Sequence, residues 1–448
     1  MQVTESKGIQ EALSWLFSFL NTEDHHRPSL ADFYLPRTEA LLTTLGSPQQ
    51  AYPSIIVAGT NGKGSTSAML EAILRAKGLK VGLYTSPALH CLREQIQVNR
   101  RLIPETDFAS LVNLLKPKVA QLMAHEGPFS TYEITTALAL LYFAKMEVDY
   151  AVLEIGLGGR CDAVNVVSPV LSVLTSISRD HTNLLGTTLA AIAREKAGII
   201  KPHIPAVTTV QAAEVMEVLL QKAEENATSL YVVDEQGLHN SLTGEFQPFP
   251  FPLRSEQIAL AGTFQLENAQ LAVGASLLLQ NQRLAISTEA MREGLAKVRW
   301  PLRLERLYSQ PLVLADGAHN EGGAKALRAS LEIYFPIERL FLILGFSGDK
   351  DLPTLMQILL PIAQVVILTR SPHPRACPLE QLEAAALPYV QGSLLSADTV
   401  AAALAQALDL ASPTDVICVT GSLFTAAAAA TFFAAKTFDS TKFLENSA

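Results

Sequence analysis

A glycine-rich run with one lysine and two hydroxyl residues is the part of this sequence best suited to chemistry. The run from Val57 to Thr66 follows a β-branched stretch and precedes a helical pattern that extends to about Lys77. A strand that leads through a glycine-rich turn into a helix directs several backbone N–H groups at one point, which suits a phosphate. Lys63 can reach the outer phosphates, and the hydroxyl of Ser65 or Thr66 is placed for magnesium. The predicted phosphate-loop residues are Gly59, Thr60, Asn61, Gly62, Lys63, Gly64, Ser65 and Thr66.

This loop departs from the common P-loop, because Gly64 separates the lysine from the hydroxyl residue. The alternative interpretation is an ordinary strand-to-helix turn whose lysine faces solvent. The co-occurrence of strand, glycines, lysine, hydroxyls and helix in the expected order favours the phosphate loop.

Alternating strands and helices position this loop. Strands are predicted at 81–84, 151–155, 170–176 and 206–210, and helices at 108–122, 135–145 and 189–196. Apolar strands separated by helices indicate a mostly parallel sheet that is covered on both faces. Ligands of such sheets bind beyond the carboxyl ends of the strands. Glu154 and the phosphate loop both lie at strand ends, so we expect them to face one crevice suited to a magnesium nucleotide.

A second alternating block follows Trp300-Pro301. Its predicted strands are 312–315, 340–344, 365–368 and 416–419, and before it come an irregular or β-containing region at 226–258 and a helix around 265–279. The expected fold is α/β, with an ATPase domain at 1–299 and a smaller Rossmann-like domain at 300–448.

Composition limits the remaining possibilities. Charged residues make up 17% of the 448-residue chain and the net charge is −9, so nucleic-acid binding is not expected. The four cysteines show no C-x-x-C spacing and no secretory signal is evident, which predicts reduced thiols in the cytoplasm. The apolar stretch 416–435 is interrupted by Thr420-Gly421-Ser422, so we expect a strand, a turn and an alanine-rich helix rather than a membrane anchor.

An ordered series of motifs resembles one branch of the Mur ligase superfamily, the folylpolyglutamate synthases and dihydrofolate synthases. After the phosphate loop the matching motifs are Thr85-Ser86-Pro87, Thr131-Tyr132-Glu133, Glu154 to Arg160, Asp180-His181-Thr182, Arg194 to Lys201 and Gln265 to Ala269. Those that follow are Arg303-Leu304-Glu305, Asp316 to Asn320, Asp349-Lys350-Asp351, Pro374-Arg375-Ala376 and Gly421-Ser422-Leu423.

The resemblance implies an ATP-dependent ligase that joins L-glutamate to a folate-type carboxylic acid, either dihydropteroate or a reduced folate. It implies that the γ-phosphoryl group passes to the substrate carboxylate, and that the amino group of glutamate attacks the resulting acyl phosphate. A monomer without nucleic-acid or membrane partners is expected.

The resemblance also assigns roles to residues. Ser65 and Glu154 would hold one magnesium, Ser86 and His181 would surround a second metal, and Lys196 would carry a carbamate. Lys63, His181 and Lys196 are therefore the predicted catalytic residues. The predicted nucleotide contacts beyond the loop are Asn268, Arg303, Asp316 and His319, with ATP between two domains that close on it. The predicted substrate pocket contains Thr131, Tyr132, Glu133, Cys161, Asp162 and Ala163.

Departures from the family pattern fall on the folate side. Ala88 stands where the family has histidine and Gln95 where arginine is common, although Arg93 and Arg160 remain as cations. We therefore expect dihydrofolate synthase activity at least, with polyglutamate extension retained.

Three other interpretations stay open at this point. A cell-wall Mur ligase normally brings a further N-terminal domain, for which about fifty residues before the loop are too few. A P-loop switch ATPase would not need the second block. A catalytically silent relative would lack part of the ATP or metal set, which is complete here.

Overall fold

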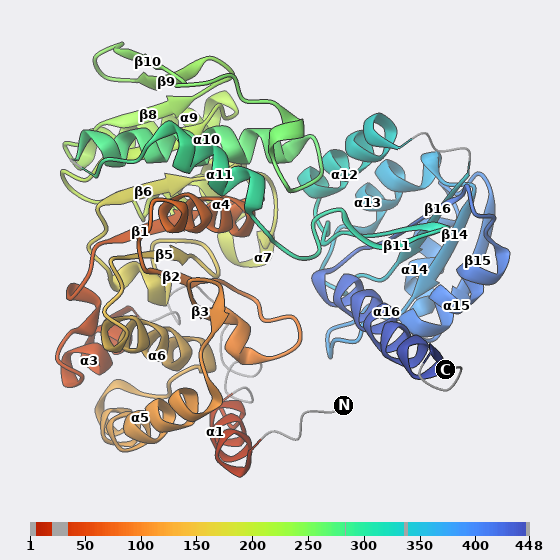
Figure 1. The fold of residues 1–448 in the computed structure, drawn as a ribbon, viewed down its shortest axis with the longest axis horizontal. Helices are drawn as coiled ribbons and strands as arrows, with labels where there is room; N and C mark the ends of the chain where they lie inside the picture. The colour runs from red at the N-terminus through yellow and green to blue at the C-terminus, as the bar shows by residue number, and fades with distance from the viewer. Residues whose placement is uncertain (1–5, 20–34, 283, 336–338, 445–448) are drawn as a thin grey trace. The chain divides into compact units, whose positions relative to one another are not determined.

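The structure is a computed structural model that describes residues 6–19, 35–282, 284–335 and 339–444, with side chains to residue 435. The chain divides into two compact units, whose elements are labelled in Figure 1. The first contains Met1–Ala259 and Glu267–Val298, and the second contains Leu260–Leu266 and Arg299–Ala448. The predicted division after residue 299 did not separate the segment Leu260–Leu266 from the first domain.

A sheet with a parallel centre forms the middle of the first unit. Its order among the described residues is β10-β9-β8-β7-β6-β1-β5-β2-β3-β4. The strands from β8 to β2 pair in parallel, and both ends of the sheet are antiparallel. The bounds are β1 Ser54–Ala58, β2 Val81–Tyr84, β3 Ile96–Val98, β4 Arg101–Leu102, β5 Tyr150–Glu154, β6 Leu171–Leu174, β7 Ala206–Thr209, β8 Leu230–Val233, β9 Gly237–Asn240 and β10 Phe246–Pro248.

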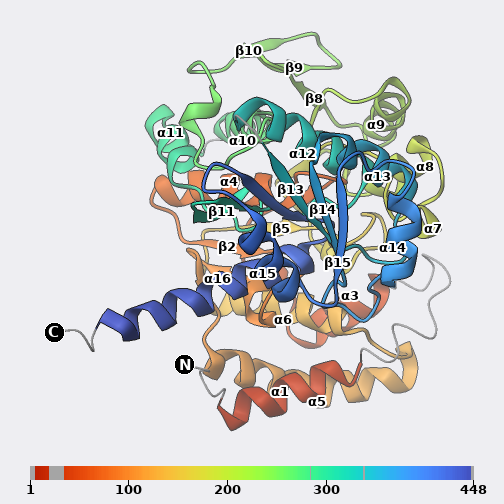
Figure 2. The same cartoon turned by 90° about the vertical axis from the view of Figure 1, so that its right-hand side faces the viewer.

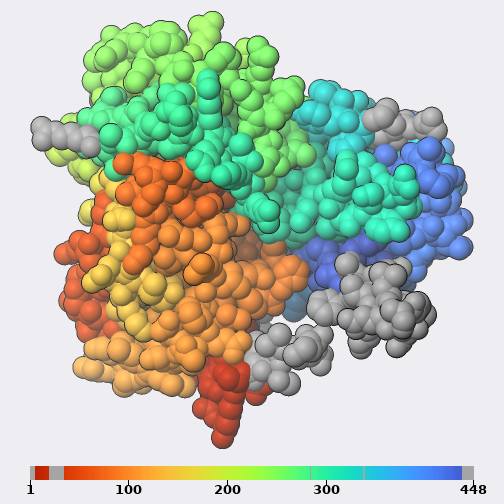
Figure 3. Space-filling model, in the orientation of Figure 1, coloured from red at the N-terminus to blue at the C-terminus, as the bar shows by residue number. Residues whose placement is uncertain are grey.

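Helices α4, α6 and α9 pack against strands of this sheet, and α1, α5 and α11 pack mainly on other helices. The helices of this unit are α1 Lys7–Phe17, α3 Leu35–Thr44, α4 Lys63–Ala76, α5 Glu105–Glu126, α6 Thr131–Lys145, α7 Thr182–Leu185, α8 Leu189–Ala197, α9 Ala213–Glu225, α10 Phe264–Asn281, of which Glu267–Asn281 lies in this unit, and α11 Thr288–Lys297. Apolar residues of α5 recur every three to four positions and are buried, so α5 presents its other face to solvent (Figure 3, light orange).

Helix α4 is buried on almost every side, which fixes the end of the phosphate loop. Gly294 of α11 lies so close to α4 that a Cβ there would be 2.6 Å from the Ile73 Cα. This close packing of two helices holds α4, and with it the loop that enters it, in one position.

The second unit has a six-stranded sheet in the order β11-β12-β16-β13-β14-β15, parallel except for β11. Its strands are β11 Glu305–Ser309, β12 Leu312–Ala315, β13 Leu340–Leu344, β14 Val365–Thr369, β15 Ser393–Ala397 and β16 Val416–Thr420. Its helices are α12 Glu321–Tyr334, α13 Leu352–Leu359, α14 Leu379–Ala386, α15 Val400–Leu410 and α16 Leu423–Leu444. In Figure 2, β13, β14 and β15 lie side by side.

Successive residues of these strands point to opposite faces of the sheet and belong to two separate hydrophobic cores. Leu342 belongs to the core that also contains residues of α12, α13 and α14, whereas its neighbours Phe341 and Ile343 belong to the core with α15 and α16. Helices therefore cover both faces of the sheet, and the predicted α/β fold is confirmed.

Most predicted elements are present with small shifts of their ends. The predicted strands 81–84, 312–315 and 340–344 have the observed bounds. Helix α4 begins at Lys63 rather than at the predicted Thr66, and α6 begins at Thr131 rather than at Thr135. Region 226–258 contains β8, β9 and β10. Residues 416–435 form β16, a turn and part of α16, and none of the described helices meets the length and apolarity that a membrane span requires.

Candidate active site

The phosphate loop takes its shape from two glycines with positive φ. Gly59 has φ 149° and Gly62 has φ 88°. A Cβ on Gly59 would lie 1.8 Å from the Thr175 Oγ1, and a Cβ on Gly62 would lie 2.3 Å from the Asn268 Oδ1. Only glycine fits both the conformation and the space at these positions. The turn therefore connects β1 directly to α4, and the first N–H groups of α4 lie at the carboxyl end of β1.

Two lysines meet at one carbonyl group of this loop. Lys63 Nζ donates to the carbonyl oxygens of Gly59 at 3.2 Å and Thr60 at 3.1 Å. Lys196 Nζ, from the last turn of α8, donates to the same Gly59 oxygen at 2.7 Å. Burial, and to a smaller extent the nearby charge of Lys63, together lower the pKa of Lys196 to about 7. Although Lys196 follows charged residues in α8, its side chain is buried rather than solvated.

Three of the predicted metal-binding residues lie at the ends of neighbouring strands. Ser65 is buried in the first turn of α4, and Glu154 is buried at the end of β5, whose residues pair with β1. The Ser86 backbone N–H donates to Glu154 Oε2 at 3.3 Å. Magnesium prefers oxygen ligands and is commonly held by one or two carboxylates together with substrate phosphates. One carboxylate and one hydroxyl beside a phosphate loop fit that preference.

His181 begins the short helix α7 in a left-handed conformation, with φ 49°. Its backbone N–H donates to Asp180 Oδ1 at 2.8 Å, and its Nε2 lies 3.9 Å from Asp180 Oδ2. Within the described part of the chain, no three His, Cys, Asp or Glu side chains gather as a metal cluster. The second-metal role of Ser86 and His181 stays a prediction.

The predicted folate pocket contains a closed network of hydrogen bonds. Asp162 Oδ2 accepts the backbone N–H groups of Gly156 at 3.1 Å and Leu157 at 3.0 Å, and Tyr132 Oη donates to Asp162 Oδ1 at 3.2 Å. Burial raises the pKa of Asp162 to about 6. Tyr84 stacks on Tyr132, with ring centroids 6.3 Å apart. This network holds the glycine-rich loop after β5 in place.

Two predicted pocket residues have contacts that stabilise the fold. Glu133 is buried, forms an ion pair with Arg37 at 2.9 Å and closes the capping box of α6 with Ser130. Thr131 Oγ1 donates to the carbonyl of Leu16. Ala163 is buried, whereas Tyr132 and Cys161 are partly exposed. Arg37 was not found from the sequence, because its partner lies 96 residues away.

The two cations expected near the folate are already paired. Arg93 donates to the Ile103 carbonyl and forms an ion pair with Glu105 at 3.3 Å. Arg160 forms an ion pair with Glu195 at 3.0 Å. Both arginines are therefore present as cations, but each already has a carboxylate partner.

The remaining residues that the sequence predicts to contact the nucleotide occur in both units. In the first unit, Thr66 Oγ1 lies 3.5 Å from Asn268 Oδ1. In the second unit, buried Asp316 accepts the N–H groups of Leu304 at 3.0 Å and Ala318 at 2.8 Å, and burial raises its pKa. His319 Nδ1 lies 2.8 Å from the Gly317 carbonyl oxygen, and Arg303 Nη1 donates to the Leu302 carbonyl at 2.9 Å.

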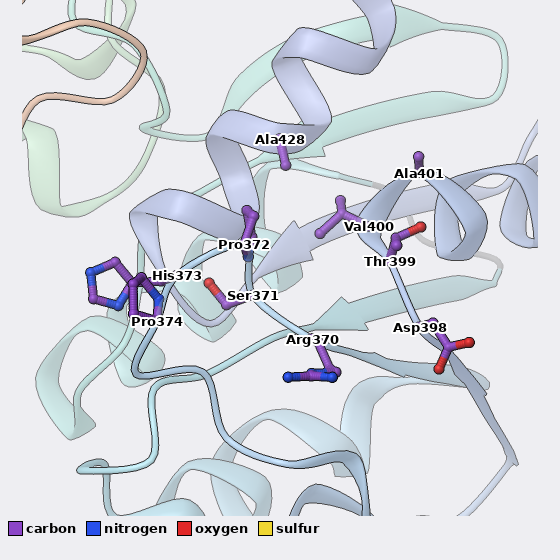
Figure 4. Close-up of a pocket in the computed structure, with 10 residues that line it drawn as sticks. All are labelled: Arg370, Ser371, Pro372, His373, Pro374, Asp398, Thr399, Val400, Ala401 and Ala428. Atoms are coloured by element: carbon purple, nitrogen blue, oxygen red, sulfur yellow. The ribbon is translucent and has the colours of Figure 1, made fainter.

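A pocket of about 550 Å³ lies in the second unit, where β14 and β15 end (Figure 4). Arg370, Ser371 and Asp398 are among the residues that line it. Thr399 caps α15 at its edge by accepting the Ala402 N–H. None of the site residues predicted from the sequence lines this pocket.

Comparison with known proteins agrees with this arrangement. Residues 57–276 match the Mur ligase middle domain, and residues 302–423 match the glutamate ligase domain of Mur ligases. The dihydrofolate synthase/folylpolyglutamate synthase of Bacillus subtilis is 36% identical over 82% of this chain and 86% of its own length. The folylpolyglutamate synthase of Lacticaseibacillus casei is 34% identical over 93% of this chain and 97% of its own length.

Solved structures of folylpolyglutamate synthases are similar in fold to this chain over nearly its whole length. The folylpolyglutamate synthase of Mycobacterium tuberculosis complexed with ADP has a TM-score of 0.82 and 33% identity, covering 95% of this chain and 98% of that one. The Escherichia coli FolC structure in complex with DHPP and ADP has a TM-score of 0.79 and 29% identity, covering 96% and 98% of the two chains. Two α/β units with a phosphate loop at the strand ends of the first thus define an ATP-dependent ligase of the Mur type. Within that class, the chain belongs to the folylpolyglutamate synthase and dihydrofolate synthase family.

Proposed function

We propose that this protein ligates L-glutamate to a folate-type carboxylic acid at the expense of ATP, and that it accepts dihydropteroate as well as reduced folates. The observation that carries the proposal is the convergence of Lys63 and Lys196 on the Gly59 carbonyl, at the mouth of a phosphate loop. A phosphate loop that only binds a nucleotide uses one lysine to contact the phosphates. A second, buried lysine with a pKa near neutrality supports phosphoryl-transfer chemistry at the same place.

In this proposal the loop N–H groups and Lys63 hold the β- and γ-phosphates. Ser65 and Glu154 hold a magnesium ion, and Ser86 and His181 surround a second one. Bound magnesium offsets the charge that develops on the transferring phosphoryl group. Lys196, once carbamylated, turns from a cation into an anion that supports the second metal. Asn268, Arg303, Asp316 and His319 contact the nucleotide.

The folate side relies on Tyr132, Cys161 and Asp162. Tyr132 offers an aromatic surface whose orientation is fixed by Tyr84 and Asp162, which suits a flat pterin ring. Because Arg93 and Arg160 are engaged by Glu105 and Glu195, few cations are available for a long polyglutamate tail. We therefore expect dihydropteroate to be the better substrate.

The test is phosphate release from ATP with glutamate and, in separate reactions, dihydropteroate, a reduced folate or a muramyl nucleotide. Release is expected with the first two acids, faster with dihydropteroate, and is expected to be absent with the muramyl nucleotide. Turnover of the muramyl nucleotide alone would assign the chain to a cell-wall ligase instead.

The Lys63→Ala variant tests the phosphate loop in the same assay. It should lose at least about a hundredfold in kcat, because it removes a charge directed at the transferring group. Lys77→Ala, at the other end of α4, is the matched control and should keep wild-type turnover. Wild-type turnover in Lys63→Ala would show that the loop assignment is wrong.

A further inference from the structure

A side-chain amide extends the central sheet next to the phosphate loop. Gln211 comes two residues after the end of β7. Its Oε1 accepts the Ile177 N–H at 3.1 Å, and its Nε2 donates to the Thr175 carbonyl at 3.0 Å. The last pair of the β6–β7 ladder is Leu174 with Thr208. The amide therefore takes the place of the next peptide group, since it accepts and donates as a strand peptide does.

Residues 175–178, which accept and donate hydrogen bonds with Gln211, also form hydrogen bonds with the phosphate loop. The backbone N–H groups of Thr60 and Asn61 donate to the Ser176 carbonyl at 2.8 and 3.2 Å. Thr60 Oγ1 donates to the Ser178 carbonyl at 3.0 Å and accepts the Ser178 N–H at 3.1 Å. Asn61 Nδ2 donates to Ser178 Oγ at 3.0 Å. Any shift of this segment is therefore passed on to the loop.

The same segment leads directly to Asp180 and His181. His181 lies three residues beyond this segment and has a left-handed backbone with φ 49°. Gln211 thus contacts a stretch of chain that hydrogen-bonds to the phosphate loop and continues to the predicted second metal site. Gln211 also reaches Thr208 Oγ1 at 3.1 Å, which holds the amide to the end of β7.

We infer that Gln211 is a positioning residue for phosphoryl transfer, which acts by fixing segment 175–178 and through it the phosphate loop and His181. The inference rests on the proposed function, because it assumes that the loop binds ATP. Misplacing a reacting group by about 1 Å can cost on the order of a hundredfold in rate. A loss of alignment should therefore lower kcat while the fold persists.

The experiment uses Gln211→Glu, which keeps length and shape but replaces the donor with an oxygen that faces the Thr175 carbonyl. The matched control is Gln282→Glu, because Gln282 Nε2 donates to the Val170 carbonyl at 3.0 Å, next to the opposite end of β6. Both changes add one negative charge and remove one amide donor. Only Gln211 lies at the phosphate-loop end.

We expect Gln211→Glu to lower kcat at least tenfold and to raise the KM for ATP, with the KM for glutamate unchanged. Gln282→Glu should keep kcat within twofold. The melting temperatures of the two variants should lie within a few degrees of each other. Equal losses of kcat in both variants, or a wild-type kcat in Gln211→Glu, would overturn the inference.

Ser178→Ala gives a second route if Gln211→Glu does not fold. It removes the acceptor of Asn61 Nδ2 without touching the sheet, and kcat should fall severalfold. In the double variant the two losses should be less than multiplicative, because both changes act on one segment. Multiplicative losses of kcat in the double variant, or an unchanged kcat in Ser178→Ala, would contradict the inference that Gln211 acts through segment 175–178. Wild-type turnover in Lys63→Ala would refute the phosphate-loop assignment in the proposed function, whereas an inactive Lys63→Ala with a fully active Gln211→Glu would refute only the role of Gln211.

Discussion

The Gly59 carbonyl oxygen accepts hydrogen bonds from two lysines, one of which sits in a buried environment. Desolvation is the larger cause of the lowered pKa of Lys196, and repulsion from Lys63 adds to it. Near neutral pH a substantial share of Lys196 is therefore a neutral amine, the form that adds carbon dioxide. Carbamylation would replace the repulsion between two cations with attraction.

The titration of Lys196 should be visible in stability. Its pKa falls from the usual 10.5 to about 7 on folding, so between these values the unfolded chain binds more protons than the folded one. The free energy of unfolding should therefore rise with pH from about 7 towards 10.5, relative to a Lys196→Met variant, by at most about 1.4 kcal/mol per pH unit. Urea titrations of both proteins at several pH values in buffer free of carbon dioxide would measure the difference. A difference that is flat or falls in this range would contradict the buried position.

A shorter substitution tests catalysis. Lys196→Ala should lose most activity, and a short carboxylate in excess should restore part of it by replacing the missing anion. Lys201 is close in sequence but is a poor control, because it donates to the Asn165 carbonyl and is partly buried, so its loss would also disturb the fold. Lys297, exposed on α11, is the better control.

At the scale of elements, α4 has a glycine with positive φ at each end. Gly62 caps its start with φ 88°, and Gly78 follows its end with φ 96°. Alanine at either position should cost about 1–2 kcal/mol of stability through backbone strain. Only Gly62 also touches Asn268, whereas a Cβ on Gly78 would meet no atom within 4 Å.

Gly62→Ala should therefore weaken ATP binding at least tenfold, while Gly78→Ala should leave it unchanged at a similar loss of stability. Isothermal titration with a non-hydrolysable ATP analogue, alongside thermal unfolding, would measure both effects. Equal affinity in the two variants would mean that the contact between Gly62 and Asn268 does not shape the nucleotide site.

The strands predicted to the residue, such as 340–344, are continuous apolar runs that are buried on both faces. The antiparallel β3, β4 and β11 were not predicted, because β4 and β11 are largely exposed and show no apolar run. The start of α4 was placed three residues late because Gly64 lowers the helix propensity of its first turn. Periodicity detects burial, and it fails where an element lies at the edge of a sheet or begins with glycine.

The residues of the candidate site also differ in how well they could be predicted from the sequence. The predictions for the phosphate loop and Glu154 came from distinctive residue types next to a strand end, whereas the prediction for Lys196 came only from the family resemblance. Gln211 and Ser178 were missed because a single glutamine after a strand, or a serine in a loop, has no spacing that marks it. Their contacts join segments more than 30 residues apart in one case and more than 110 in the other, which only the fold reveals.

At the scale of the whole molecule, each unit has its own core, but the units do not correspond to two continuous stretches of chain. The second unit takes residues 260–266 from the middle of the first. Within that unit the backbone N–H of Thr263 donates to Ser330 Oγ at 3.1 Å, and Phe264 packs against the core that contains Leu327 and Leu331. The seven-residue segment is thus a structural part of the second unit.

This discontinuity determines how the second unit can be produced in isolation. A fragment that starts at residue 299 lacks the Thr263 hydrogen bond and the Phe264 ring, so it should unfold at a lower urea concentration than the same fragment with residues 260–266 joined to its start by a glycine–serine linker. We expect a gain of about 1–3 kcal/mol from the restored contacts, and Phe264→Ala in the linked fragment should remove most of it. If both fragments unfold alike, the split between the units lies at residue 299 after all. If the linked fragment is the more stable, a chimaeric protein that joins this second unit to another ATPase domain must also contain residues 260–266.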